Sequence, residues 1–218
     1  MFFNNPDVWE VTLLSLKVSG LATAISLLIG LPVGTGLALG RYPGRNFLLS
    51  VVNTGMALPP VVVGLAVAMV LWRSGPLGDL NLIYTPSAIV IAQTIIAAPV
   101  VTGLTSASLQ QLDPRLRLQL YGLGASRVQM IVNLWRQARL PLLAALMAGF
   151  GSVISEVGAS MMVGGNILHQ TRVLTTSIVL QTDMGNFRSA IALAILLLLI
   201  TFLINSALTW IQQRGVKR

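Results

Sequence analysis

Long apolar runs dominate the chain, and charged residues are concentrated between them. Four runs lack any Asp, Glu, Lys or Arg: residues 18–40, 46–72, 80–112 and 189–213. A fifth run, 140–165, contains a single charged residue, Glu156. Each run exceeds the roughly 20 helical residues that cross about 30 Å of hydrocarbon. Because the runs do not alternate with the period of two that barrel strands require, they predict an all-α polytopic membrane protein.

We expect about five transmembrane helices in a single transmembrane domain covering residues 1–218. Their approximate ranges are 12–40, 46–72, 86–108, 140–165 and 188–212. The 80–112 run is too long for one straight crossing, so its first residues are assigned to an outer loop. The first run is not interpreted as a secretion signal, because acidic Asp7 and Glu10 precede it and it exceeds the usual apolar core of about 7–15 residues.

Composition supports this class, with 55% hydrophobic and 9% charged residues and a mean hydropathy of +0.81. The net charge of +8 is explained by topology. With the N-terminus outside and the C-terminus inside, the inner basic residues are Arg41, Arg45, Arg115, Arg117, Arg127, Arg136, Arg139, Arg214, Lys217 and Arg218. The outer ones are Lys17, Arg73, Arg172 and Arg188. This excess follows the positive-inside rule, so no nucleic-acid partner is expected.

The chain has no cysteine, which excludes disulfides and thiolate metal sites.

The inner segment 113–139 is too long for a simple turn and has a helical pattern. Its apolar positions are Leu116, Leu118, Leu120, Val128, Ile131, Val132, Leu134 and Trp135. Arg and Gln occupy much of the rest, which predicts two short amphipathic helices joined at 122–124. Such a pair either lies on the inner lipid headgroups or docks a cytoplasmic partner.

Two stretches carry a resemblance to a known family. GLGASRVQMIVNLWRQARLPLL, from Gly122, resembles the cytoplasmic coupling loop of binding-protein-dependent ABC importers. It departs from the common form because Leu118, Gln119 and Leu120 replace Glu-Ala-Ala, and because Gly124 and Pro141 are four residues further apart. SEVGASMMVGGNILHQTRVLTTSIVLQT, from Ser155, resembles permeases for molybdate, sulfate and tungstate. WRQARLPLLAA followed by ISEVGASMMVGGN is most similar to the tungstate branch, and ALPPVVVGL is similar to the second span of the group.

This resemblance implies a MetI-like type I ABC importer permease in a bacterial or archaeal inner membrane, carrying tungstate. Molybdate or sulfate is the alternative substrate within the family. The implied partners are a second copy of the chain, two cytoplasmic P-loop ATPases, an extracytoplasmic oxyanion-binding protein and membrane lipid. ATP and Mg would bind to the ATPases, because this chain has no G-x-x-x-x-G-K-[ST] loop. No cofactor, metal site or catalytic residue is expected in this chain.

The segment 113–139 also supplies candidate contacts for the ATPase. They are Gln119, Gly122, Gly124, Ala125, Ser126 and Arg127. The glycines allow a turn between the two short helices, and Arg127 is the first candidate for a polar contact, or alternatively rests at the lipid headgroups. A rigid helix that continues into a membrane span through Pro141 could relay the movement of the ATPase.

The candidate pathway or gate residues lie near the breaks and ends of the spans. They are Pro59, Pro60, Pro99, Ser155, Glu156, Gly158, Asn166, Thr171, Arg172, Thr175 and Thr176. The prolines should break helical hydrogen bonds and mark a pathway wall. Glu156 would repel an anion, so a structural or gate-closing role is favoured over substrate contact. The threonines either form an outer vestibule with Arg172 or cap helix ends.

Three further features bear on packing and on the class of protein. The glycine pairs Gly30/Gly34 and Gly36/Gly40 suggest helix-packing seams. An intramembrane enzyme is disfavoured, since the only histidine, His169, is in an outer loop and no H-E-x-x-H or G-x-S-x-G motif occurs. An ATP-independent secondary transporter or channel remains the alternative from another class, although the chain shows no convincing internal repeat.

Overall fold

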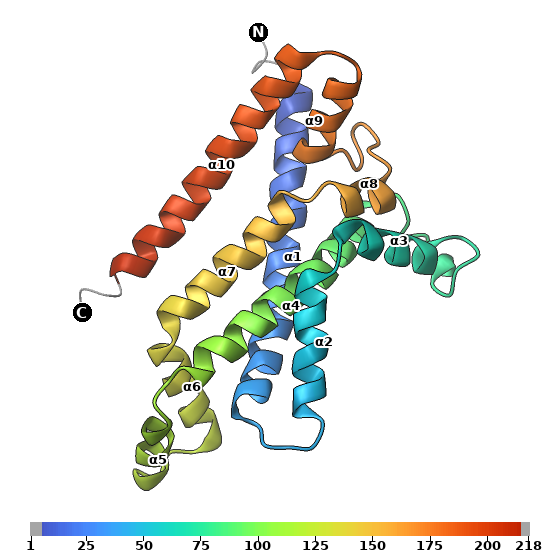
Figure 1. Cartoon of the computed structure of the whole chain (residues 1–218). Helices are drawn as coiled ribbons and strands as arrows, with labels where there is room; N and C mark the ends of the chain where they lie inside the picture. The colour runs from blue at the N-terminus through green and yellow to red at the C-terminus, as the bar shows by residue number, and fades with distance from the viewer. Residues whose placement is uncertain (1–5, 215–218) are drawn as a thin grey trace.

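The computed structural model describes residues 6–214, and their regular structure is helical. The elements are α1 (Pro6–Leu39), α2 (Arg45–Ala57), α3 (Pro60–Leu71), the 3₁₀ turn η2 (Gly78–Leu80), α4 (Pro86–Gln110), α5 (Pro114–Gly122), α6 (Arg127–Gln137), α7 (Arg139–Ile154), α8 (Gly158–Gly164), α9 (Leu174–Asp183) and α10 (Phe187–Arg214). In Figure 1, α4 crosses α1 at the centre, while α10 runs along one edge.

Three helices of the described chain, α1, α4 and α10, are long and apolar enough to cross a membrane alone. Two bent pairs, α2–α3 at 101° and α6–α7 at 75°, raise the number to five if each pair counts as one crossing. The break between α2 and α3 falls at Leu58 and Pro59, which are both extended. Proline lacks an N–H and disfavours a helical residue before it, so the apolar run 46–72 cannot be one straight helix.

Two segments differ from the helices that the sequence predicts. The 140–165 run is divided, because α7 ends at Ile154 and α8 begins at Gly158. Conversely, α4 continues through Pro99, where a broken helix is expected. A proline removes a single N–H, and α4 packs against α1, α2, α3, α7 and α8, so tertiary contacts hold the helix through that position.

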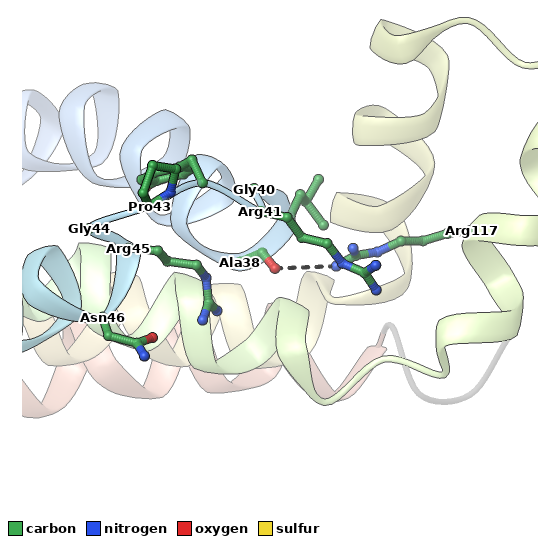
Figure 2. A pocket seen from close by; sticks show the side chains of 10 residues that line it. Ala38, Gly40, Arg41, Pro43, Gly44, Arg45, Asn46 and Arg117 are labelled. Atoms are coloured by element: carbon green, nitrogen blue, oxygen red, sulfur yellow. Dashed lines mark hydrogen bonds between the residues drawn. The ribbon is translucent and has the colours of Figure 1, made fainter.

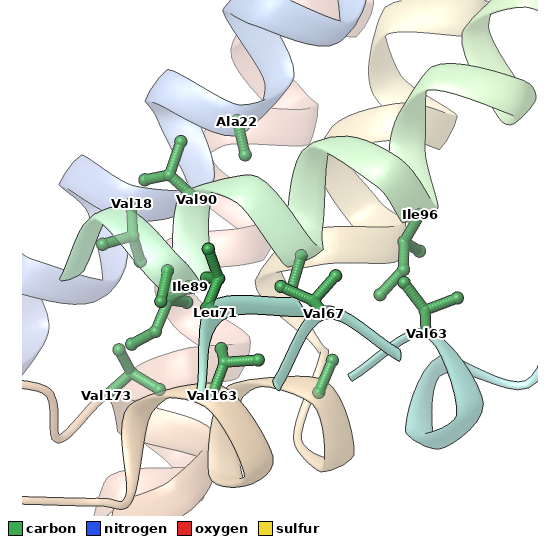
Figure 3. Packing of buried hydrophobic residues seen from close by; sticks show 13 residues of the cluster. Val18, Ala22, Val63, Val67, Leu71, Ile89, Val90, Ile96, Val163 and Val173 are labelled. Atoms are coloured by element: carbon green, nitrogen blue, oxygen red, sulfur yellow. The ribbon is translucent and has the colours of Figure 1, made fainter. Parts of the chain in front are cut away.

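The main core joins α1, α3, α4 and α8, as Figure 3 shows around Ile89, Val67 and Val163. Close approach of α1 and α4 depends on Gly30 and Gly34. An added Cβ would lie 2.7 Å from the Val101 side chain at Gly30, and 2.6 Å from the Thr102 carbonyl oxygen at Gly34. This pair is therefore a packing seam, as predicted.

The second glycine pair does not form a seam within the described chain. A Cβ at Gly36 would have no heavy atom within 4 Å, and the nearest atoms to a Cβ at Gly40 belong to Tyr42 and the Gly36 carbonyl, both close in the sequence. The predicted seam is wrong here because the helix ends at Leu39, so the two glycines do not share a continuous helical face.

The fold separates two ends of the bundle. The turn between α1 and α2 lies at the same end as α5 and α6, whereas the start of α1 lies near α9 and the start of α10 (Figure 1). Arg41, Arg45, Arg117 and Arg127 belong to the first end, which is the grouping that the charge pattern predicts. Lys217 and Arg218, also assigned to that side, lie outside the described residues.

Candidate functional site

The segment 113–139 forms the two short helices expected from its pattern, and contacts with the rest of the bundle fix them. Met130 and Leu134 are buried in a cluster with Ala38 of α1 and Leu109 of α4. The indole Nε1 of Trp135 donates a hydrogen bond to the Thr35 hydroxyl at 2.9 Å. Because both apolar and polar contacts join α6 to α1, the segment is a packed part of the bundle.

The turn between α5 and α6 is shaped by Gly124 and Ser126. Gly124 has a φ of +75°, a left-handed conformation that favours glycine. The Ser126 hydroxyl accepts from the Gln129 N–H at 3.3 Å, and the Gln129 side chain accepts from the Ser126 N–H at 2.8 Å. This capping box gives α6 a defined first turn.

All six predicted coupling residues cluster at this turn. Gln119, Gly122, Gly124, Ser126 and Arg127 are exposed, and Ala125 is half-buried. We call residues 118–128 the coupling tip. Its outer surface presents glycine backbone, one guanidinium group and several small or polar side chains, which suits contact with another protein.

The coupling tip also exposes apolar side chains that the sequence reasoning missed. Leu118, Tyr121, Leu123 and Val128 are 71%, 55%, 83% and 70% exposed. Leu118 and Val128, which belong to the apolar positions of the sequence pattern, do not lie on the packed face of the helices. Leu118 lies two positions before Leu120, and Val128 lies two positions before Met130; Leu120 and Met130 belong to the packed cluster. Residues two positions apart on an α-helix are separated by about 200° around the helix axis, so they point to opposite sides. The two-residue spacing could therefore have shown from the sequence alone that Leu118 and Val128 point away from the packed face.

Helix α6, which begins within the coupling tip, is joined to α7 by a single residue. α6 ends at Gln137 and α7 begins at Arg139, with a bend of 75° between them. The intervening Ala138 is fully buried. A short, packed connection of this kind can transmit a displacement of α6 into α7 with little loss.

Glu156 lies in the break between α7 and α8 and is 8% exposed. Its carboxylate oxygen Oε1 accepts from the Ala159 N–H at 2.9 Å, in the first turn of α8. The Thr175 hydroxyl donates to the Glu156 carbonyl at 2.8 Å. These contacts satisfy polar groups that the broken helix would leave unpaired, and they favour the structural role over substrate contact.

The other residues at this break are engaged in local contacts. Ser155 is exposed and its hydroxyl donates to the Gly151 carbonyl at 2.8 Å. The Val153 carbonyl accepts from the Gln93 side chain of α4 at 3.1 Å. The end of α7 is therefore tied to α4, and the start of α8 is tied to Glu156.

Pro60 is the first residue of α3 and Pro59 is its extended N-cap, and this helix packs tightly on α8. A Cβ at Gly158 would lie 2.5 Å from the Val61 side chain. The structure thus brings Pro60, Glu156 and Gly158 into one region. Pro99 is separate, because it packs on Gly55 of α2, where a Cβ would lie 2.9 Å from the proline ring.

The α8–α9 loop and the first turn of α9 do not present their threonines to solvent. Thr171, Thr175 and Thr176 are 1%, 6% and 0% exposed. The Thr171 hydroxyl donates to the Gly164 carbonyl, and the Thr176 hydroxyl accepts from the Val173 N–H at 3.1 Å. Because these hydroxyl groups bond to backbone, the contacts fit the capping alternative better than the vestibule.

Arg172 is the half-exposed member of this group, and Asn166 orients it. The Arg172 Nε donates to the Asn166 side-chain oxygen at 3.2 Å, and a terminal guanidinium nitrogen donates to the Asn166 carbonyl at 3.2 Å. Arg172 also lines a cavity of about 220 Å³ with Asp7. It is the residue of the group best placed to meet an anion.

His169 is exposed, as expected for a loop residue, but it also has a charged partner. Its Nδ1 lies 2.7 Å from a Glu10 carboxylate oxygen of α1. The hydrogen bond to Glu10 raises the pKa of His169 above its ordinary value. The pair links the α8–α9 loop to the start of α1.

Comparisons with known proteins agree with this architecture. Residues 27–217 match the family described as "Binding-protein-dependent transport system inner membrane component". A probable anion ABC transporter permease protein of Haloferax volcanii is 38% identical over 202 residues, covering 90% of this chain and 87% of that protein. A tungstate uptake system permease protein of Peptoclostridium acidaminophilum is 38% identical over 209 residues, covering 96% and 92%.

A solved structure supports the fold. An inward-facing form of the MetNI methionine ABC transporter superposes with a TM-score of 0.77 at 20% identity, covering 95% of this chain and 94% of that chain. This likeness confirms the all-α, MetI-like fold that the sequence resemblance implies. The chain therefore belongs to the inner membrane components of binding-protein-dependent ABC transport systems, as a multi-pass permease subunit with no catalytic activity of its own.

Proposed function

We propose that the chain is the permease of an ABC importer for a tetrahedral oxyanion, and that tungstate is its substrate. The observation that carries this proposal is the near full-length similarity to a tungstate uptake permease. The family assignment adds that transport depends on a binding protein and on an ATPase supplied by another chain.

In the proposed assembly, two copies of the chain form the pathway and two cytoplasmic P-loop ATPases bind ATP and Mg. The ATPase docks on the coupling tip. Its exposed Leu118, Tyr121, Leu123 and Val128 supply apolar contact area around Arg127, which is a combination typical of interface cores. The bound ATPase would move α6 and, through buried Ala138, α7.

The pathway is proposed to hold the anion weakly. A divalent oxyanion bound tightly within the membrane could not leave, so selection is assigned to the extracytoplasmic binding protein. Glu156 and the tightly packed α3–α8 contact then act as a closed gate rather than as a binding site. Arg172 offers a cation at the end of the bundle that is proposed to face outward.

The test uses the permease–ATPase complex reconstituted in vesicles with its binding protein. ATP-driven uptake is measured with tungstate, molybdate and sulfate in turn. The proposal predicts that tungstate is taken up with the highest kcat/KM and only with ATP. Preference for molybdate or sulfate would overturn the substrate assignment, and ATP-independent uptake would instead support a secondary transporter or channel.

A further inference from the structure

A cluster of arginines lies at the other end of the bundle, around the turn between α1 and α2. This turn and α5 enclose a pocket of about 620 Å³, which we call the arginine pocket. It is lined by residues 38–46 and Arg117. Figure 2 shows the side chain of Arg41 reaching from the turn toward that of Arg117, with Arg45 and Asn46 alongside.

Two of the arginines are held in place by α1. Arg45 Nε donates to the Leu37 carbonyl at 2.6 Å. An Arg117 guanidinium nitrogen donates to the Ala38 carbonyl at 3.5 Å, which is the dashed line in Figure 2. These bonds satisfy carbonyl groups at the C-terminal end of α1. Since each guanidinium group has five N–H donors, both arginines retain donors for a ligand.

The charge of the pocket is not balanced within the described residues. Its lining contains no carboxylate, and within residues 6–214 no salt bridge is found for Arg41, Arg45 or Arg117. A cleft lined by one sign of charge concentrates counter-ions. Three arginines on one cavity therefore favour an anion with more than one oxygen, which guanidinium groups bind bidentately.

The backbone adds to this preference. α2 has 13 residues and starts at the pocket, with Gly44 as its N-cap at φ +84° and no side chain capping the helix. The free N–H groups of a first helical turn and the helix dipole both attract phosphate-like anions. The start of α2 and the three arginines therefore lie at the same cavity.

We propose that the arginine pocket binds a tetrahedral oxyanion of the phosphate type, either a lipid phosphate headgroup or free inorganic phosphate. Because Arg41 belongs to the turn and Arg117 to α5, the bound anion links the α1–α2 turn to the helix that carries the coupling tip. The site is separate from the proposed transport pathway, so its test does not depend on uptake.

The test measures binding to the full-length chain purified in detergent and stripped of lipid. Thermal unfolding is followed during titration with inorganic phosphate in one arm and with short-chain phosphatidylglycerol in the other. A saturable rise of the unfolding temperature is expected in at least one arm. Saturation by phosphate identifies a free-anion site, and saturation by the lipid alone identifies a headgroup site.

Arg41→Gln should weaken this binding by about tenfold, since it removes one charge-assisted contact. Arg41 is exposed, so the variant should fold normally. Arg115→Gln is the matched control, because Arg115 is an exposed arginine of α5 outside the pocket lining. It should change the affinity by less than about twofold.

Asn46→Asp provides a second variant. It places a carboxylate in the lining at the start of α2, where a negative charge suits the helix, and it should abolish anion binding without loss of fold. If neither probe stabilises the wild type saturably, or if Arg41→Gln and Arg115→Gln weaken binding equally, the site does not exist.

Discussion

The carboxylate of Glu156 and the hydroxyl groups of Thr171, Thr175 and Thr176 all bond to backbone atoms at helix breaks. In a bilayer, a broken helix leaves N–H and C=O groups that water cannot satisfy. Side chains must then supply the missing partners. Polar residues in this apolar chain therefore have a structural explanation before a transport role is considered.

Glu156→Ala should destabilise the fold by about 1 kcal/mol, because the Ala159 N–H loses its acceptor. Glu156→Gln retains an acceptor oxygen and should cost less. Both are measured by denaturant unfolding of the purified chain. If Glu156→Gln unfolds like the wild type but alters substrate selectivity in uptake, the charge acts in the pathway and the structural role is wrong.

The His169–Glu10 pair predicts a pH-dependent contact. The pKa of His169 is raised in the folded state by its hydrogen bond to Glu10. Its stabilising contribution is fully present below the unfolded pKa, about 6.5, and is lost as the pH rises through the higher folded pKa.

We therefore expect the wild type to unfold at a higher temperature than His169→Gln at about pH 5.5, and at the same temperature at about pH 8.5. The effect should be small because the pair is solvent-exposed. A difference between the two proteins that is constant across this range would contradict the ion-pair interpretation.

Among the helices, the breaks differ in how well the sequence predicts them. The α2–α3 break follows from adjacent prolines, whose effect is local. The α7–α8 break at 155–157 has no proline or glycine pair to mark it. Its stabilising partners, Gln93 and Thr175, are distant in the sequence. Helix α4 is the opposite case: its sequence contains a helix breaker, Pro99, but packing keeps the helix continuous through that position.

The α3–α8 contact predicts a specific effect of Gly64→Ala. The new Cβ would lie 2.6 Å from the Ala159 Cα, a backbone atom that cannot turn away. Separating the two helices should cost about 1–3 kcal/mol in the free energy of unfolding. Gly20→Ala is the control, because its Cβ would meet nothing within 4 Å, and it should leave stability unchanged or raise it by up to about 1 kcal/mol through helix propensity. Equal effects would rule out tight packing.

At the scale of the whole molecule, the three long apolar helices α1, α4 and α10 and the shared end of Arg41, Arg45, Arg117 and Arg127 could be predicted, because apolar length and charge distribution both follow from transfer into a bilayer. The pairing of α1 with α4 could not, since continuous apolar helices do not reveal their neighbours. The exposed side of the coupling tip was missed for a related reason. Leu118 and Val128 are apolar but face away from the bundle, as residues reserved for a partner would.

The most direct measurement of the central claim is attachment of the ATPase to a permease altered only at the coupling tip. Deleting 113–139 would also remove the Trp135–Thr35 contact, so point variants are preferable. Leu123→Asp with Val128→Asp changes side chains that are 83% and 70% exposed and should leave the unfolding temperature unaltered. Met184→Asp, at a 62% exposed apolar residue near the opposite end, is the control.

Our account predicts that the double variant retains at most about one tenth of the co-purified ATPase and loses ATP-driven uptake, while Met184→Asp keeps the ATPase bound. Full ATPase attachment and normal uptake in the double variant would contradict it.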